Sequence, residues 1–169
     1  MQGFHEISVS ALDNAITMIG KEWMLITAND KEHGRANAMT ASWGALGVLW
    51  HKNVAICFVR PQRYTYGLTE QEERFSLAFM GEGYRDALKL CGTKSGRDGD
   101  KLAMAGLSTV DCDGVPVIAE ARLVLVCRKL YADNLREDSF IDPSLLGNYA
   151  AKDYHRVYVC EIEHAYERD

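Results

Sequence analysis

Apolar runs with the composition of β-strands dominate this sequence and restrict the folds that it can adopt. Residues 53–59 (NVAICFV) are a continuous stretch of mostly β-branched and aromatic side chains, which is typical of a buried strand. Pro61 ends this strand because proline has no N–H to donate to a sheet. The other expected strands lie at residues 23–28, 37–43, 75–80, 121–131 and 157–166.

Short helices are expected between these strands, at residues 65–73, 84–91 and 98–105. Thr69 and Glu72 have the spacing of a capping box, and Thr65 is an alternative cap one turn earlier. Gly92 is the expected end of the second helix, and Asp98 is the expected N-cap of the third. The strands do not alternate with long helices, as a doubly wound sheet would require. The sequence therefore predicts a mainly β fold, a closed barrel with short helical insertions.

The length of 169 residues fits a single domain over residues 1–169. The net charge of -5 argues against a general surface for nucleic acid or for anionic membranes. Residues 1–10 lack the basic and apolar regions of a secretory signal, and no apolar run is long enough to span a bilayer. We therefore expect neither a nucleic-acid nor a membrane partner.

The cysteines and histidines indicate neither a disulfide nor a metal site. Five cysteines form no CxxC pair, and an odd count without a signal favours reduced thiols in a cytoplasm. Cys57, Cys127 and Cys160 lie in apolar strand-like runs, so we expect them in the core. The histidines show no paired metal-ligand spacing, so no metal is predicted. His155, just before the last expected strand, is the one that we single out for an active-site role.

The segment 91–101 (CGTKSGRDGDK) concentrates backbone donors, hydroxyls and cations in an acidic chain. Its glycines allow tight turns that bring N–H groups close to a ligand, and a helix start would add a positive dipole end. This pattern favours an anion, above all a phosphate. It is not a Walker A loop, because the glycine spacing differs. A solvated, flexible loop is the alternative interpretation.

Two other segments complete the pattern. Residues 60–65 (RPQRYT) place arginines between a buried strand and a helix, where Arg63 would chelate a phosphate. The alternative is a surface ion pair from Arg63 to one of the nearby glutamates, which are Glu70, Glu72 and Glu73. Residues 37–44 (NAMTASWG) are small enough for a planar ring to lie along the strand, with Trp43 or Met39 at its edge. The alternative there is a core strand of small residues.

In this order, the three segments resemble the flavin reductase-like family of FMN-binding split barrels, particularly its flavoredoxin-type branch. The similarity extends from about Trp23 to Tyr166. The resemblance implies a homodimeric split β-barrel that binds FMN near the subunit interface. Relatives often have an asparagine where this chain has Ala78, a departure that affects any side-chain contact from that strand.

The resemblance also implies a role for each matching residue. The isoalloxazine and ribityl region would be lined by Met39, Thr40, Ala41 and Ser42. The ribityl chain and phosphate would be held by Arg63, Tyr64, Thr65, Ser95, Gly96, Arg97 and Lys101. Arg60 would brace the site. No catalytic residue is assigned, because hydride transfer to a flavin does not require an acid–base side chain.

The implied activity is that of an FMN-dependent oxidoreductase that takes electrons from NAD(P)H. Backbone N–H groups and cations would stabilise the negative charge of the reduced flavin. The alternative is a flavoredoxin-like electron carrier without NAD(P)H-dependent reductase activity of its own. A third interpretation is a flavin-responsive binding module without turnover. A redox protein or free flavin is the expected partner besides the second subunit.

Overall fold

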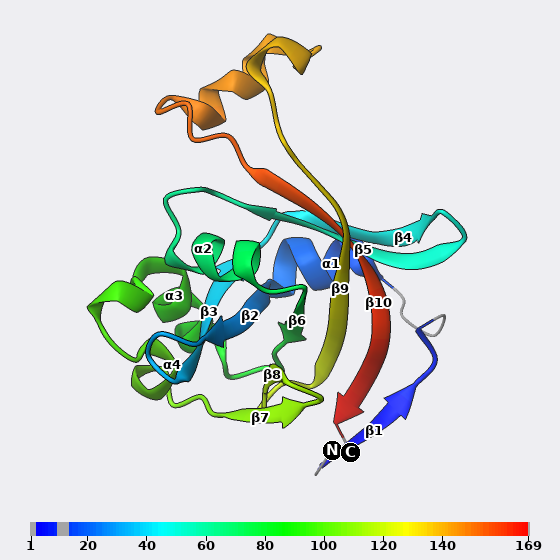
Figure 1. Cartoon of the computed structure of the whole chain (residues 1–169), viewed down its shortest axis with the longest axis vertical. Coiled ribbons are helices and arrows are strands. Elements are labelled where there is room, and N and C mark those ends of the chain that lie inside the picture. The colour runs from blue at the N-terminus through cyan, green and yellow to red at the C-terminus, as the bar shows by residue number, and fades with distance from the viewer. Residues whose placement is uncertain (1–2, 10–13, 169) are drawn as a thin grey trace.

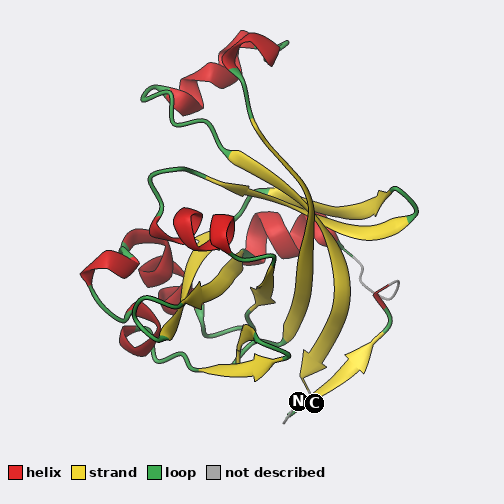
Figure 2. Ribbon diagram, in the orientation of Figure 1, coloured by secondary structure: helices red, strands yellow, loops and turns green. Residues whose placement is uncertain are grey.

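One antiparallel sheet of eight strands forms the body of the protein (Figures 1 and 2). The structure is a computed structural model and describes residues 3–9 and 14–168. The strands of the sheet are β1 (Phe4–Ile7), β2 (Met24–Asp30), β3 (Arg35–Ala41), β4 (Gly44–Leu49), β5 (Lys52–Val59), β6 (Arg74–Phe79), β9 (Leu123–Asn134) and β10 (Arg156–Arg168). A separate hairpin is made by β7 (Thr109–Cys112) and β8 (Val115–Ile118).

The strand order is β3-β2-β6-β9-β10-β5-β4, with β1 added to the far end of β10. β3 and β4 end this path and do not pair with each other, so the closed barrel expected from the sequence is wrong in that detail. The barrel is split, and the chain itself crosses the gap, because only Ser42 and Trp43 separate β3 from β4. The split of the barrel therefore lies directly beside the predicted ring-binding segment.

Short helices cover the edges of the sheet. They are α1 (Ala15–Thr17) with the π-turn η2 (Met18–Glu22), α2 (Tyr64–Gln71), α3 (Arg85–Thr93), the 3-10 turn η3 (Gly96–Asp98) and α4 (Lys101–Met104). α2 and α3 both contact β2 and β3, and α4 contacts β3. This packing brings the two predicted anion-binding segments onto the same edge of the barrel.

Two apolar cores lie on the two faces of the sheet. The inner core fills the barrel and contains Phe75, Tyr158 and the three cysteines that the sequence places in strands, Cys57, Cys127 and Cys160. The expected burial of these cysteines is confirmed. The outer core packs α3, α4 and β8 against the sheet. Ala78 belongs to this outer core and is fully buried, so β6 offers no polar side chain at that position.

The helix boundaries differ from expectation where a side chain competes for a cap. Asp98 ends η3, and the N-cap of α4 is Asp100, whose carboxylate accepts a hydrogen bond from Ala103 N at 3.1 Å. α2 begins after Arg63 without a side-chain cap, so both predicted caps are wrong. The Thr69 hydroxyl instead donates to the carbonyl of Thr65 at 3.1 Å inside the helix. Residue spacing in the sequence did not indicate which of these side chains caps a helix.

Two features project from the barrel (Figure 1). One is the β4–β5 hairpin. The other is a segment that we call the arm, residues 135–155, which joins β9 to β10 and contains η4 (Glu137–Ser139) and η5 (Pro143–Tyr149). Neither was predicted from the sequence. Within residues 3–9 and 14–168, no helix has the length and apolar character needed to cross a membrane.

Candidate functional site

A cleft of about 190 Å³ opens where the chain crosses the split of the barrel. It is lined by Met39, Thr40, Ala41, Ser42, Trp43, Phe58, Arg60, Arg63 and His155. Met39 and Ala41 are buried, whereas Trp43 keeps 46% of its surface exposed at the rim. The cleft thus joins a small apolar strand to aromatic rings and two arginines.

Two cations meet at the end of α3. Arg63 Nη1 donates to the carbonyl of Gly92 at 2.7 Å. Lys101 Nζ donates to the carbonyls of Cys91 at 3.1 Å and Lys94 at 3.2 Å. The last carbonyls of a helix lack intrahelical partners and carry partial negative charge, which explains why these cations stay there. The segments 60–65 and 91–101, distant in the sequence, therefore converge in space.

These cations have no carboxylate to neutralise them. Among the residues that the structure describes, no acidic side chain forms an ion pair with Arg63, Arg97 or Lys101. The alternative interpretation, an ion pair from Arg63 to a glutamate, is not seen in the described part of the chain: Glu70 pairs with Arg156 and Glu72 with Lys31. Burial, with a smaller contribution from Arg63, lowers the pKa of Lys101 to about 8. Burial and Arg60 also lower the pKa of Arg63. An anion placed here would relieve this electrostatic strain.

The turn at residues 95–97 lies against α2 and β3. The Ser95 hydroxyl accepts a hydrogen bond from Arg97 N at 3.2 Å, which caps the turn. A Cβ on Gly96 would overlap Asn37 Oδ1 and Tyr64 Cδ1, so only glycine fits. The guanidinium of Arg97 lies over the Tyr64 ring, 5.2 Å from its centroid. Gly96 is thus buried and packed in place, whereas Arg97 and Asp98 are exposed, so the turn is anchored at its glycine.

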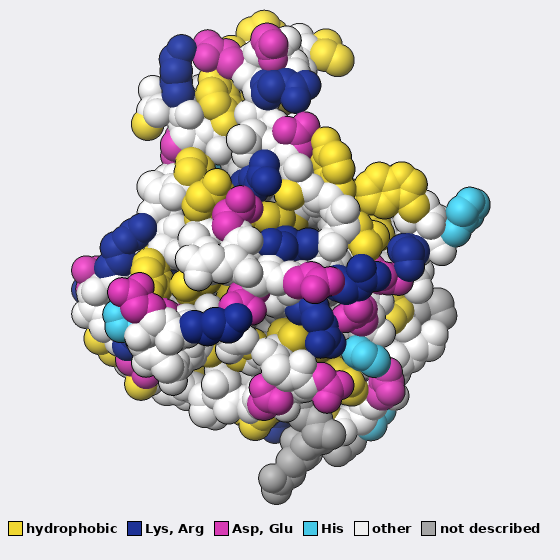
Figure 3. Space-filling view, viewed as in Figure 1, with side chains coloured by type: hydrophobic (Ala, Val, Ile, Leu, Met, Phe, Trp, Pro, Cys, Tyr) yellow, Lys and Arg dark blue, Asp and Glu magenta, His cyan; other side chains and the backbone are white. Residues whose placement is uncertain are grey.

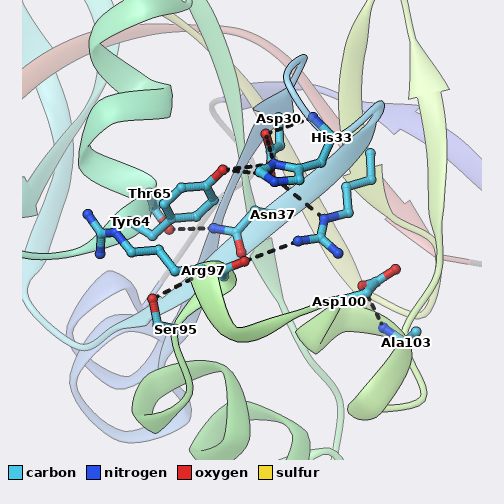
Figure 4. Close-up of polar contacts among 11 residues, drawn as sticks. Asp30, His33, Asn37, Tyr64, Thr65, Ser95, Arg97, Asp100 and Ala103 are labelled. Atoms are coloured by element: carbon cyan, nitrogen blue, oxygen red, sulfur yellow. Dashed lines mark hydrogen bonds and ion pairs between the residues drawn. The ribbon is translucent and has the colours of Figure 1, made fainter.

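The side chains of Tyr64 and Thr65 point toward β2 and β3, where they meet Asp30 and Asn37 (Figure 4). The Tyr64 hydroxyl donates to Asp30 Oδ2 at 2.9 Å, and the Thr65 hydroxyl accepts from Asn37 Nδ2 at 2.8 Å. Both residues form the first turn of α2, where backbone N–H groups have no intrahelical acceptor. Any contact from Tyr64 and Thr65 to an anion therefore comes from the main chain.

Arg60 and His155 connect the cleft to the arm. Arg60 Nη1 donates to Asp153 Oδ2 at 2.5 Å, and Nη2 donates to the carbonyl of Asn148 at 2.8 Å. His155 Nδ1 lies 2.8 Å from the Tyr149 hydroxyl, and its ring is 5.2 Å from that of Trp43. Burial and the nearby Arg60 lower the pKa of His155 to about 4, so the ring is neutral at pH 7.

The structure thus places the residues expected from the sequence in three groups. Met39, Thr40, Ala41, Ser42 and Arg63 line the cleft. Lys101, with Ser95, Gly96 and Arg97, surrounds the end of α3 and the start of α2. Tyr64 and Thr65 form the third group, and their side chains bond to Asp30 and Asn37.

Sequence reasoning missed Phe58 in the cleft and the polar cluster around Asp30. Phe58 lies in the apolar run of β5, where nothing local separates a core side chain from a cleft side chain. Asp30 lies beyond the strand expected at residues 23–28, but it is the last residue of β2 and is fully buried. A charged residue next to an apolar strand was the only available signal.

The chain is similar to known proteins in sequence and in structure. The flavin reductase like domain matches residues 18–169. No curated protein sequence matches the chain. Flavoredoxin from Methanosarcina acetivorans superposes with a TM-score of 0.68 at 23% identity, covering 98% of this chain and 76% of that one.

Two further solved structures are similar. The FMN-binding protein from Thermus thermophilus, crystallised with p-hydroxybenzaldehyde, has a TM-score of 0.67 at 22% identity, covering 87% of this chain and 71% of that one. The NADH:FAD oxidoreductase SgcE6 from Streptomyces globisporus has a TM-score of 0.66 at 15% identity, covering 88% and 78%. These similarities confirm the split-barrel fold. The domain match over residues 18–169 shows that this chain belongs to the flavin reductase-like family.

Proposed function

We propose that this chain is a single-domain FMN-dependent oxidoreductase that takes electrons from NAD(P)H. The observation that carries the proposal is the meeting of Arg63 and Lys101 at the end of α3, without a carboxylate partner among the described residues, beside a cleft walled by a small-residue strand. A buried positive pair with no counter-charge suits a phosphate, and a narrow strand wall suits a flat ring. The donor set therefore fits FMN.

Different residues would contact different parts of FMN. Met39, Thr40, Ala41 and Ser42 would lie along the ring and the upper ribityl chain. The phosphate and lower ribityl chain would be held by Arg63, Ser95, Gly96, Arg97 and Lys101, with main-chain N–H groups of Tyr64 and Thr65. The Thr40 hydroxyl already donates to the carbonyl of Leu88 at 2.5 Å, so its lone pairs remain available as acceptors.

When bound, FMN supplies the hydride and electron chemistry at its ring. The protein would position it and exclude water from one face. An apolar groove of about 470 Å³ adjoins the cleft, and the two share Ser42 and Trp43. Room for a second flat molecule beside the first supports a reductase that binds a nicotinamide. The neutral His155 at the same wall offers a ring nitrogen without adding charge.

A flavoredoxin-like electron carrier is the second candidate. The exposure of Trp43 at the rim of the cleft favours it, because an aromatic ring on the surface suits docking of a redox protein. The purified protein should absorb at about 450 nm if it retains flavin. Anaerobic stopped-flow mixing with NADH or NADPH then separates the candidates. Bleaching within catalytic times supports the reductase, no bleaching supports the carrier, and failure to bind FMN removes both.

We also propose a homodimer. The β4–β5 hairpin exposes Val48 (74%), Leu49 and Trp50, and the arm exposes Ile141 and Leu145. Apolar side chains gather over this hairpin in the space-filling view (Figure 3). A second copy of the chain would bury them. Light scattering coupled to size exclusion tests this, and a monomeric mass at micromolar concentration would contradict it.

A further inference from the structure

The buried carboxylate of Asp30 lies at the end of β2 and faces the Tyr64 hydroxyl and His33 (Figure 4). Asp30 is fully shielded from solvent. It accepts hydrogen bonds from the Tyr64 hydroxyl at 2.9 Å and from His33 N at 3.3 Å, and His33 Nδ1 lies 3.0 Å from both of its oxygens. Arg35 Nε lies 3.7 Å from Oδ2. A buried charge with this many partners is strongly fixed in position.

Two chains of contacts connect the Asp30 carboxylate to Gly96, one through Tyr64 and one through Arg35. Through Oδ2, Asp30 holds Tyr64, whose ring packs against Gly96 and underlies the guanidinium of Arg97. Beside the same oxygen lies Arg35, whose Nη2 donates to the carbonyl of Gly96 at 3.1 Å. The Tyr64 ring restricts the position of the Gly96 α-carbon, and the hydrogen bond from Arg35 fixes the orientation of the peptide between Gly96 and Arg97.

The orientation of this peptide matters for anion binding. A phosphate is recognised by N–H groups whose directions are set by the turn, so rotation of one peptide plane turns a donor away. Ser95 and Arg97 flank Gly96 directly. The Arg97 N–H already donates to Ser95 Oγ at 3.2 Å and closes the turn, so the donors that this turn would present are the Gly96 N–H, the Ser95 hydroxyl and the Arg97 guanidinium. No acidic side chain on this turn fixes it, since the Asp98 and Asp100 carboxylates have no recorded hydrogen bond to residues 95–97.

We propose that Asp30 is a positioning residue for phosphate binding: it holds Tyr64 and Arg35 so that the Ser95–Gly96–Arg97 turn is preformed for the phosphate of FMN. The inference rests on the proposed FMN binding. Asp30 does not contact the ligand. It raises affinity for a phosphorylated flavin over one without phosphate by reducing the ordering needed on binding.

The test compares FMN with riboflavin, which has the same ring and ribityl chain but no phosphate. Asp30→Asn removes the charge, and Tyr64→Phe removes only the hydroxyl while keeping the ring under Arg97. Dissociation constants of both flavins are measured by fluorescence titration at equal ionic strength. We expect the preference for FMN to fall about tenfold in each variant, as for loss of a charge-assisted hydrogen bond. Riboflavin affinity should stay close to that of the wild type.

The chain offers a matched control in Tyr131 and Asp133. The Tyr131 hydroxyl donates to Asp133 Oδ2 at 2.9 Å, the same chemistry and distance, but on the exposed part of β9. Tyr131→Phe and Asp133→Asn should leave the preference for FMN unchanged. The double variant Asp30→Asn/Tyr64→Phe should lose little more than Asp30→Asn alone, because the contact that Tyr64→Phe removes is one of those that Asp30→Asn already weakens.

The outcomes separate this inference from the proposed function. A wild-type protein that binds neither flavin removes the proposed FMN site and the inference with it. A wild-type protein that prefers FMN, with the same preference in Asp30→Asn and Tyr64→Phe, overturns the role of Asp30 alone. Where Asp30→Asn fails to fold, Tyr64→Phe decides the question, since it removes one hydroxyl and no packing surface. An equal loss of FMN and riboflavin affinity also overturns the proposal, because it indicates a general structural defect.

Discussion

If FMN binds as proposed, the protonation of Lys101 should make its affinity depend on pH in a range where few other groups titrate. In the free protein the pKa of Lys101 is about 8, mainly because its ammonium is buried and secondarily because Arg63 is near. Only 4% of the residue is exposed, so solvent screening is weak. A bound phosphate would place a negative charge beside the ammonium and raise its pKa again. Binding is therefore expected to take up a proton above pH 8.

The magnitude follows from linkage. At pH 7 about nine-tenths of Lys101 is protonated in the free protein, and at pH 9 about one-tenth is. If the bound form keeps the proton, the dissociation constant of FMN should rise about tenfold from pH 7 to pH 9, close to 1.4 kcal/mol. The phosphate does not contribute, because its second pKa of about 6 lies below this range.

The same shift has an opposite effect on the free protein. The pKa of Lys101 is lower in the folded chain than in the unfolded chain. The corresponding stability is therefore fully present above the unfolded value of 10.5 and is lost as the pH falls through 8. At pH 7 the charged ammonium costs the free protein about 3 kcal/mol on this basis. FMN should consequently raise the melting temperature more at pH 7 than at pH 9.

Fluorescence titration of FMN at pH 7, 8 and 9 measures the effect, and calorimetry in two buffers of different ionisation enthalpy counts the protons. The Lys101→Met variant should bind FMN more weakly and show a flat profile. Riboflavin binding should be independent of pH in both proteins. A wild-type dissociation constant that stays constant from pH 7 to pH 9, with no proton uptake, would refute the reasoning.

Three further perturbations test other parts of the structure. Gly96→Ala should destabilise the fold by about 1–3 kcal/mol in urea denaturation, because its Cβ would overlap Asn37 and Tyr64. Gly67→Ala in α2, where a Cβ meets nothing within 4 Å, should instead stabilise the fold by about 1 kcal/mol. The pKa of His155 is about 4 in the folded protein against an ordinary value of 6.5. The corresponding stability is therefore present above pH 6.5 and is lost as the pH falls through 4. His155→Phe should remove about 3 kcal/mol of this pH dependence, as measured by urea denaturation from pH 4 to pH 7. Arg60→Ala should free the arm from the barrel and speed its cleavage in limited proteolysis, and an unchanged cleavage rate would contradict the bracing role.

The fold was predictable where a segment carries its own signal. β5 is a continuous apolar run, and β10 alternates apolar side chains with polar ones, so both were recognisable as strands from composition and pattern. β4 was missed because Gly44–Leu49 is small and partly exposed, and its strand conformation comes from pairing with β5. A Cβ on Gly44 would lie 2.8 Å from the carbonyl of Ile56, a constraint visible only once the pairing is known. The arm was missed for a similar reason, since its anchor is the long-range contact of Arg60 with Asp153.

The site was predictable as a set of residue types and not as a set of contacts. Cations and glycines concentrated in two short segments indicated an anion, and these segments do meet. The Asp30–Tyr64 contact joins residues 34 positions apart, and neither residue has a local pattern that would reveal it. A buried acidic residue beneath a basic turn is a feature of tertiary packing, which single-sequence reasoning does not reach.

The structure also changes the physical explanation of the anion site. The sequence suggested that a helix beginning at Asp98 would direct its positive end at a phosphate, but α4 begins at Lys101 and has four residues. Arg63 and Lys101 instead lie at the negative end of α3 and donate to its last carbonyls. These bonds hold two flexible side chains in one place before any ligand arrives, and they leave further N–H donors on each cation. At the proposed site, the end of α3 would therefore lower the entropic cost of gathering charge around a phosphate, which a dipole alone would not do.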